Sequence, residues 1–204
     1  MRTRSEQKRR EIVAAAASLF VEQGYERTSM SAISERVGGS KATLYGYFES
    51  KEELLRAVLA DSVAEETERL MHEFPANEAI RTGLIRLGER YLMDRLGPLP
   101  ITSIRIVATQ PESTGLGADF YANALRPAWQ WFADRIGALM EEGRLRRADP
   151  WVAAMHWKGL HEGELFEKRL LGASTSPDPS EIRRVVADAA DAFLRIYEPA
   201  PAAG

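Results

Sequence analysis

The sequence predicts an all-α protein of about nine helices, in which three N-terminal helices form a helix-turn-helix and a larger helical domain follows. Apolar residues recur with a period close to 3.6 along most of the chain, and strand patterns are nearly absent. Glycines and glycine-proline loops interrupt these periodic stretches at helix-length intervals. With 204 residues, 45% of them hydrophobic, the chain is long enough for one or two domains with a sizeable core.

The N-terminal helices are defined by their caps. The first is expected over about residues 6–23, where Ile12, Ala16, Leu19 and Phe20 form its buried stripe and Gly24 ends it. The pair Thr28-Ser29 supplies an N-cap for a short second helix, whose apolar positions Met30, Ile33 and Val37 follow at helical spacing.

The turn and the third helix come next. Gly38-Gly39 breaks the second helix, and Ser40 caps a third one with Leu44 and Phe48 facing inward. The run from Ser50 to Glu53 is a capping box that opens a long fourth helix.

Further helices are expected over about 77–95, 101–109, a long stretch ending near 141, 150–171 and 180–197, separated by loops at 97–100, 111–117 and 174–179. We expect residues 1–50 to form the helix-turn-helix domain, residues 51–198 the larger helical domain, and residues 199–204 a disordered tail rich in proline and alanine.

Charge is distributed unevenly between the two ends of the chain. Residues 1–51 carry a net charge of +3, whereas the remainder carries −6. A basic head on an acidic body lets the head approach phosphates while the body stays away from them. No apolar run reaches the length of a membrane span, and the basic N-terminus lacks the apolar stretch of a secretory signal. The absence of cysteine excludes disulfides and is compatible with the cytoplasm, where we expect the protein to act.

The third helix has the pattern of a helix that lies in the DNA major groove. Leu44 and Phe48 mark the buried side, and Ala42 and Gly46 lie opposite, flanked by Thr43. Small residues at the centre of an exposed face allow close approach to base edges, and a threonine can hydrogen-bond or contact a thymine methyl. Lysines at the starts of helices three and four add positive charge where the helix dipoles already favour an anion.

Residues 10–55, REIVAAAASLFVEQGYERTSMSAISERVGGSKATLYGYFESKEELL, resemble the DNA-binding domain of the TetR/AcrR family of bacterial regulators. The matching positions are Phe20, Gly24, Thr28, Ile33, Gly38, Ser40, Lys41, Leu44, Tyr45, Tyr47, Phe48 and Lys51. Gly39 and Ser34 depart from the family pattern, and both are expected to loosen the turn slightly. The resemblance implies that the DNA-facing residues are Thr28, Ser29, Ser40, Lys41, Ala42, Thr43, Tyr45, Gly46, Tyr47 and Lys51.

The C-terminal part is similar to the AefR-like branch, and the resemblance implies a domain for ligand binding and dimerisation. Large aromatic residues spread over several helices suit an apolar pocket, although any one of them could be ordinary core. The candidate ligand-binding residues are Tyr91, Phe120, Tyr121, Trp129, Trp157 and His161. Glycines four apart and an alanine-rich last helix suggest close helix packing between two chains. The candidate dimer residues are Gly159, Gly163, Val186, Ala189, Ala190 and Phe193.

These observations predict a sequence-specific DNA-binding transcriptional regulator. We expect a homodimer on a double-stranded operator, acting as a repressor that a small apolar or aromatic effector releases. Two alternatives remain: a DNA-binding regulator without a small-molecule ligand, or an enzyme. No catalytic, phosphate-binding or dinucleotide motif is present, and the histidines are too few and poorly spaced for a metal site. We therefore expect no catalytic residues, no metal and no cofactor.

Overall fold

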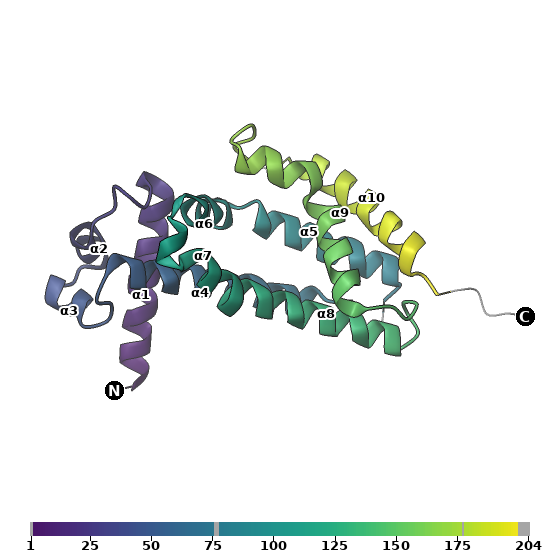
Figure 1. Cartoon of the computed structure of the whole chain (residues 1–204), viewed down its shortest axis with the longest axis horizontal. Coiled ribbons are helices and arrows are strands. Elements are labelled where there is room, and N and C mark those ends of the chain that lie inside the picture. Colours follow the sequence, from purple (N-terminus) through teal and green to yellow (C-terminus); the bar gives the residue numbers. More distant parts are fainter. Residues whose placement is uncertain (1, 76–77, 177, 200–204) are drawn as a thin grey trace, which may run out of the picture. The chain divides into compact units, whose positions relative to one another are not determined.

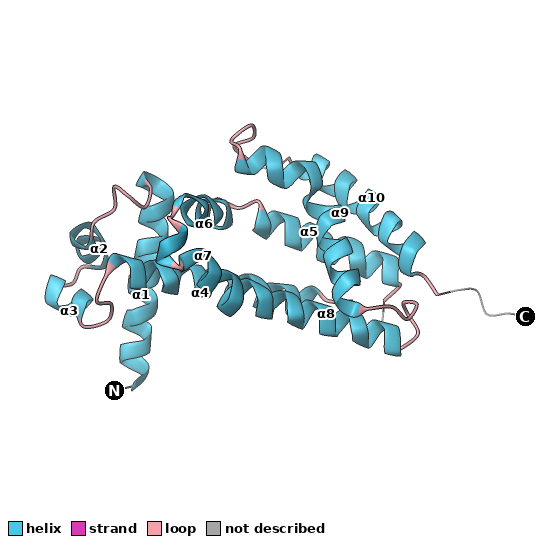
Figure 2. Cartoon of the chain, viewed as in Figure 1, coloured by secondary structure: helices cyan, strands magenta, loops and turns pink. Residues whose placement is uncertain are grey.

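The computed structural model describes residues 2–75, 78–176 and 178–199, so the predicted disordered tail lies almost wholly outside the described residues. Within them every regular element is helical, which confirms the predicted fold class (Figures 1 and 2). The chain forms two compact units: residues 1–63 with 98–124, and residues 64–97 with 125–204. The boundary predicted between residues 50 and 51 separates a DNA-binding domain from a ligand-binding domain, which is a division by function. It stays a prediction.

The first unit holds α1 (Arg2–Gln23), α2 (Met30–Val37), α3 (Lys41–Tyr45) and the first part of α4 (Lys51–Glu73), together with α6 (Pro98–Thr109), a 3₁₀ turn (Glu112–Thr114) and α7 (Leu116–Phe120). Residues 97–100, predicted as a loop, are mostly helical, because α6 begins at Pro98 and a proline is tolerated in a first helical turn. From α7 the chain continues through a π-helical turn (Tyr121–Leu125) into α8 (Arg126–Glu141). The predicted long helix ending near residue 141 is this continuous run.

Capping hydrogen bonds set the starts of the short helices. The Ser29 hydroxyl accepts from the Ala32 amide at 3.1 Å, and the Ser40 hydroxyl accepts from the Thr43 amide at 3.0 Å. Each bond satisfies an amide that a helix start otherwise leaves unpaired. The caps predicted from the sequence are therefore confirmed for α2 and α3.

The turn between α2 and α3 is set by Gly38, which matches the family pattern, and by Ser34, which departs from it. Gly38 ends α2 in the left-handed region at φ +68°, where glycine is favoured. Ser34 is buried, and its hydroxyl donates to the Gly39 carbonyl at 2.7 Å. Ser34 was expected to loosen the turn; instead its hydroxyl ties the turn through a backbone carbonyl that any residue at position 39 would supply. The expectation for Gly39 stays a prediction.

The second unit contains the later part of α4, α5 (Ile80–Arg95), α8, α9 (Pro150–Leu170) and α10 (Pro179–Tyr197). Its core is one apolar cluster that includes Leu84, Leu87, Phe132, Trp157 and Phe193. In this unit α10 packs on α5 and α9, and α8 packs on α9.

This packing corrects the predicted dimer contacts on the last helix. Val186, Ala189, Ala190 and Phe193 are at most 3% exposed within the single chain. Their small and apolar side chains allow α10 to lie close to helices of its own chain, so they are not on a surface that a second chain could reach. The alanine-rich pattern correctly predicted that this helix packs closely on other helices. The predicted partner, a second chain, was wrong, because the partners are α5 and α9 of the same chain.

The two glycines of α9, unlike the residues of α10, remain candidate dimer contacts. Gly163 has a non-helical backbone at φ +25° and ψ −126°, so the helix predicted as continuous is kinked there. A Cβ atom added at Gly159 or Gly163 would meet nothing within 4 Å, so neither glycine makes room for a neighbour in this chain. Both positions are exposed, which leaves them available to a second chain.

None of the helices in the described part of the chain combines the length and the apolarity needed to cross a membrane.

His161 is a fully buried histidine between α9 and α5. Its Nδ1–H donates to the Trp157 carbonyl at 2.8 Å, and its ring lies 4.0 Å from the Trp157 ring, centre to centre. A Cβ added at Gly88 would lie 2.4 Å from His161 Nε2, so Gly88 leaves the space that the imidazole occupies. Burial lowers the pKa of His161 to about 4, so the ring is neutral at pH 7.

We expect acid to destabilise the folded chain through His161. The folded pKa of about 4 lies below the unfolded value of about 6.5, so between these pH values the unfolded chain binds more protons. The free energy of unfolding should therefore fall as the pH drops from about 6.5 to 4, by about 3 kcal/mol in total.

Denaturant titrations of the wild type and of His161→Leu across this range test the expectation. Glu66, whose pKa burial raises to about 7, works in the opposite direction between pH 4.5 and 7 and is common to both proteins. The difference between the two titrations therefore isolates His161. Parallel curves for the two proteins would show that His161 does not titrate in this way.

Candidate nucleic-acid interface

The surface of α3 and the residues next to it forms the candidate interface. Leu44 and Phe48 are 2% and 3% exposed and hold α3 on the core of the first unit. The predicted DNA-facing positions Ser40, Lys41, Ala42, Thr43, Tyr45 and Gly46 are all exposed. Tyr45 is 51% exposed, whereas Tyr47 is only half-buried beside it. The structure thus gives α3 a buried side and an opposite side open to a ligand as large as duplex DNA.

The exposed side is flat at its centre because of Ala42 and Gly46. Gly46 follows α3 with a right-handed backbone at φ −73°, so its conformation does not require glycine. The Thr43 hydroxyl lies 2.9 Å from the Ser40 hydroxyl, which holds it at the start of the helix. The centre of this strip can approach base edges closely, and the tyrosine and lysine at its margins can reach phosphates.

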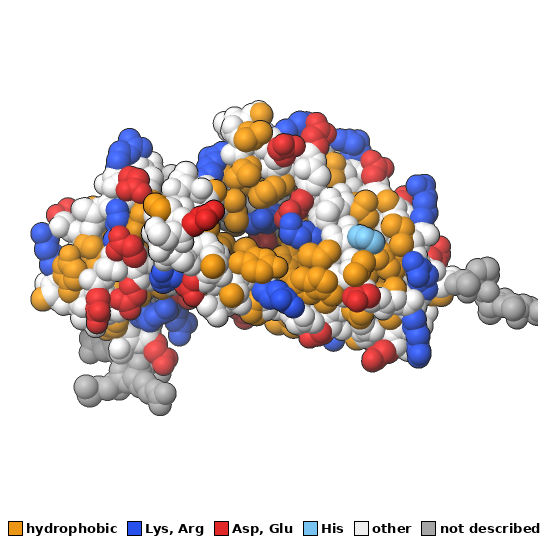
Figure 3. Space-filling view, viewed as in Figure 1, with side chains coloured by type: hydrophobic (Ala, Val, Ile, Leu, Met, Phe, Trp, Pro, Cys, Tyr) orange, Lys and Arg blue, Asp and Glu red, His pale blue; other side chains and the backbone are white. Residues whose placement is uncertain are grey.

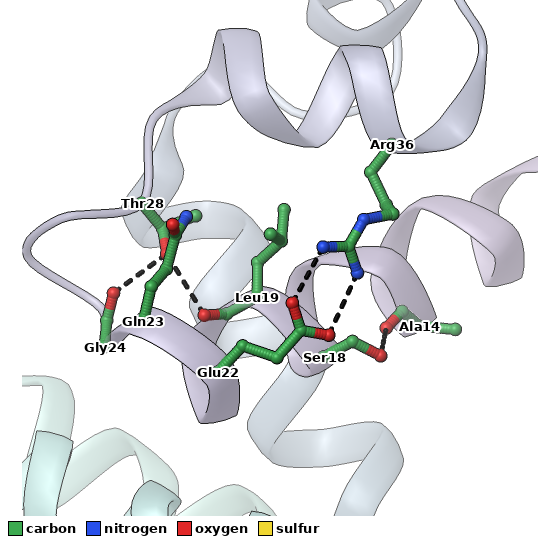
Figure 4. Close-up of polar contacts among 8 residues, drawn as sticks. All are labelled: Ala14, Ser18, Leu19, Glu22, Gln23, Gly24, Thr28 and Arg36. Carbon is green, nitrogen blue, oxygen red and sulfur yellow. Dashed lines mark hydrogen bonds and ion pairs between the residues drawn. The ribbon is translucent and has the colours of Figure 1, made fainter.

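Thr28, predicted to face DNA, is instead a buried structural residue. It is 2% exposed, and its hydroxyl donates to the Gly24 carbonyl at 2.8 Å at the end of α1 (Figure 4). The same hydroxyl accepts from the Gln23 amide at 3.3 Å. Its side chain therefore joins the end of α1 to the start of α2, while the neighbouring Ser29 stays exposed and caps α2.

An ion pair holds α2 against α1 on the other side of this region. Both guanidinium nitrogens of Arg36 donate to the Glu22 carboxylate, at 3.0 and 2.7 Å (Figure 4). The hydrogen bond from Arg36 lowers the pKa of Glu22. Because both side chains are exposed, this pair orients α2 more than it stabilises the fold.

Lys51 starts α4 and lies against Tyr25. Its ammonium group donates to the Tyr25 carbonyl at 3.0 Å and lies 4.2 Å from the centre of the Tyr25 ring. Tyr25 is buried, and burial raises the pKa of its hydroxyl to about 12. The lysine is thus fixed at a helix N-terminus, with donors left for a phosphate.

The candidate ligand-binding residues are divided between the two units. Tyr91, Trp129, Trp157 and His161 form one aromatic cluster in the second unit, with ring centres 4.0–6.5 Å apart. Phe120 and Tyr121 belong to the first unit, where Phe120 is buried and Tyr121 is 53% exposed. Tyr121 lies in the π-helical turn, so the regular helical spacing that placed it on the buried face does not hold there.

Sequence reasoning missed a charged network beside this aromatic cluster. Glu162 on α9 is 8% exposed and accepts hydrogen bonds from the Tyr91 hydroxyl at 2.6 Å, from Arg95 Nε at 2.9 Å and from the Lys158 ammonium. Despite its burial, Arg95 and Lys158 hold the pKa of Glu162 below its usual value. The signal in the sequence was the four-residue spacing of Lys158 and Glu162 and of Tyr91 and Arg95, which places each pair on one helical face.

A helix-turn-helix with an exposed second helix, followed by a helical unit with its own core, defines a class of DNA-binding regulators. Residues 82–199 match the family described as "AefR-like transcriptional repressor, C-terminal domain", and residues 12–58 match "Bacterial regulatory proteins, tetR family". Because the first match covers more than half of the chain, this protein belongs to the TetR family of bacterial transcriptional regulators and has a C-terminal domain of the AefR-like type.

Three relatives illustrate the match. The HTH-type transcriptional activator FasR of Mycolicibacterium smegmatis is 43% identical over 54 residues, which span 26% of this chain and only 25% of FasR. The structure of a TetR-family regulator from Mesorhizobium loti MAFF303099 aligns with a TM-score of 0.85 and 26% identity, over 96% of this chain and 98% of the other. The flavonoid-responsive regulator FrrA aligns with a TM-score of 0.68 and 30% identity, over 96% of this chain and 100% of FrrA.

Proposed function

We propose that this chain is a transcriptional repressor that binds operator DNA as a homodimer in the cytoplasm and dissociates when a small apolar or aromatic effector binds its second unit. The observation that carries the DNA-binding part is the exposed strip of α3 opposite the buried Leu44 and Phe48. The description of the matched C-terminal family as a repressor domain supports repression, whereas FasR is named an activator. The name of FrrA supports an aromatic effector.

The DNA-facing set is narrower than the one predicted from the sequence. It comprises Ser29, Ser40, Lys41, Ala42, Thr43, Tyr45, Gly46, Tyr47 and Lys51, since the Thr28 side chain is buried. Within this set, we assign base reading to the centre of α3 and phosphate binding to Lys51 and to the helix starts. Substitution of one residue from each group tests whether the two roles are separate.

We expect Thr43→Ala and Lys51→Ala to weaken DNA binding in different ways. Thr43→Ala should cost about 1–3 kcal/mol per half-site on the preferred duplex and little on random DNA, because only base contacts depend on sequence. Lys51→Ala should weaken binding to both duplexes about equally and lower the salt slope by about one unit per chain, because a phosphate contact releases counterions. Fluorescence anisotropy at several salt concentrations measures both effects. Equal losses on both duplexes for Thr43→Ala would contradict base reading by this residue.

TetR-family regulators act as dimers, and we propose that this chain does so through the exposed face of α9. Val152, His156 and Gly159 are exposed and share a helical face, and Gly163 is exposed at the kink that follows. Val152 is 44% exposed and gives this face an apolar side chain that a second chain could cover. Two copies also give two half-sites, which a single short recognition helix needs for tight specific binding.

Sedimentation at micromolar concentration is expected to give twice the chain mass of 22.8 kDa. A leucine at Gly159 adds a large side chain to the proposed face and should weaken association. A monomer for the wild type would contradict the dimer, and unchanged association of Gly159→Leu would place the interface elsewhere.

A regulator without a small-molecule ligand remains the second candidate. It would have the same α3 surface, but its aromatic cluster would be only core. Titration of flavonoids monitored by tryptophan fluorescence tests the aromatic class, because Trp129 and Trp157 lie in the cluster.

A further inference from the structure

A charged network in the second unit joins four cations, Arg69, Arg90, Arg95 and Lys158, to the carboxylates of Asp94, Glu162 and, through Arg69 at 3.8 Å, Glu65. Asp94 is contacted by Arg69 at 3.0 Å and by Arg90 at 2.9 Å, and Glu162 is contacted by Arg95 at 2.9 Å and by Lys158. Each of these carboxylates is therefore shared by two cations. Glu162, Asp94 and Arg95 are the best buried members, with side chains 10%, 13% and 13% exposed. The part of the network around Glu162, where Arg95 and Lys158 face one carboxylate, can accept one more negative charge.

Glu66 does not cancel this excess. It is half-buried on α4, near Arg95 and Arg69, and burial raises its pKa to about 7. A substantial fraction of Glu66 is therefore protonated and uncharged at neutral pH.

Two buried polar atoms beside this network lack a hydrogen-bond partner among the described residues, the Trp157 indole N–H and the acceptor nitrogen Nε2 of His161. The Trp157 indole N–H is fully buried and has no acceptor within the described part of the chain. A buried donor without a partner is costly, and in a native protein it calls for a missing partner. Trp157 packs on Tyr91 with ring centres 5.1 Å apart, and the Tyr91 hydroxyl is already donated to Glu162. An acceptor supplied from outside could satisfy the indole.

Aromatic surfaces border the basic groups. Lys158 Nζ lies 5.8 Å from the centre of the Trp129 ring, and Arg95 lies 4.5 Å from the Phe166 ring. Both rings are only partly buried, and the Lys158 side chain is 29% exposed. Figure 3 shows charged side chains of both signs between hydrophobic patches in the region of α5 and α9. Replacing a buried ion network by apolar packing is often neutral or stabilising, so a contribution to stability does not by itself account for this one.

We propose that this part of the second unit binds an aromatic effector that carries an acidic group, and that Lys158 and Arg95 receive the negative charge while Trp129 contacts the aromatic body. This inference rests on the proposed effector-controlled function and specifies the chemical class of the effector. Of the two cations that contact Glu162, Lys158 has the more exposed side chain, at 29% against 13% for Arg95. Lys158 is therefore the residue to substitute.

Two dyes that differ by one charge test the proposal on the full-length chain. 1-Anilinonaphthalene-8-sulfonate carries a sulfonate, and N-phenyl-1-naphthylamine has the same aromatic skeleton without it. Fluorescence titration should show the sulfonate binding at least about tenfold more tightly, because a charge partner in a partly desolvated site is worth more than one in water. Lys158→Met should remove most of this preference, and Glu162→Gln, which removes a negative charge, should increase it.

Lys168→Met is the matched control, since it removes the same charge from the same helix. Lys168 pairs with Glu164 and Glu181 and does not contact Glu162. It should leave the preference unchanged, and circular dichroism verifies that each variant is folded. Equal binding of the two dyes, or an unchanged preference in Lys158→Met, would overturn the acidic effector while leaving an apolar one possible. No saturable binding of either dye would overturn this proposal together with the proposed effector control.

Discussion

Gly46→Leu should abolish specific DNA binding while the chain stays folded. Gly46 is exposed on the side opposite Leu44 and Phe48, and its right-handed backbone accepts a side chain. A Cβ there would lie 3.3 Å from the Thr43 carbonyl oxygen, which requires a shift of only a few tenths of an ångström. The remainder of a leucine would project towards the DNA and hold α3 away from the base edges.

The expected loss on the preferred duplex is about a hundredfold or more, since contacts worth about 1–3 kcal/mol each are lost in two half-sites. Gly46→Ala is the graded control and should lose much less, because its methyl group is no larger than that of Ala42. Anisotropy titrations of the three proteins, with thermal unfolding to verify the fold, decide the matter. A leucine variant that binds its duplex with wild-type affinity would show that α3 does not enter the groove in this orientation.

Gly88→Ala should strongly destabilise the second unit. The added Cβ would lie 2.4 Å from His161 Nε2 and 2.8 Å from a Val186 methyl carbon. Neither neighbour can move easily, because His161 and Val186 are both fully buried. Overpacking of this kind costs about 1–3 kcal/mol, and the cost should appear as a lower denaturant midpoint.

A double-mutant cycle with His161→Ala separates this clash from a general effect of losing glycine. Removing the imidazole opens the space that the new methyl group needs, so Gly88→Ala should cost less in the His161→Ala background. The same cost in both backgrounds would show that the contact between Gly88 and His161 does not limit stability.

The helical fold and the recognition helix could be predicted from sequence because their signals are local. Helix signals act within one turn: Ser29 and Ser40 mark helix starts and Gly38 marks a helix end. The structure confirms that α2 and α3 begin or end at these residues. The role of Thr28 could not be predicted in this way. Its hydroxyl bonds to the carbonyls of Gly24 and Leu19, and only the folding of α1 against the next segment brings these atoms together.

Properties that depend on helix packing were less predictable. The apolar stripe of α10 around Val186 and Phe193 is equally compatible with a partner in the same chain and with one in a second chain, and the structure places it in the same chain. The kink at Gly163 interrupts helical periodicity without a proline nearby. The π-helical turn at Tyr121–Leu125 precedes Pro127, which has no backbone N–H to donate, but the sequence does not show that a π-helical turn rather than a helix break results. The network around Glu162 joins α5 to α9 over about seventy positions of sequence, so only its four-residue spacings were visible beforehand.

Selection of bound duplexes from a random DNA pool tests the central claim, that α3 reads DNA sequence, most directly. The wild-type chain should enrich one motif with two half-sites related by two-fold symmetry, as a dimer with one recognition helix per chain requires. Gly46→Leu, selected in parallel, should enrich no motif. Failure of the wild type to enrich any sequence, or enrichment of the same motif by the leucine variant, would contradict the assignment of sequence reading to the exposed side of α3.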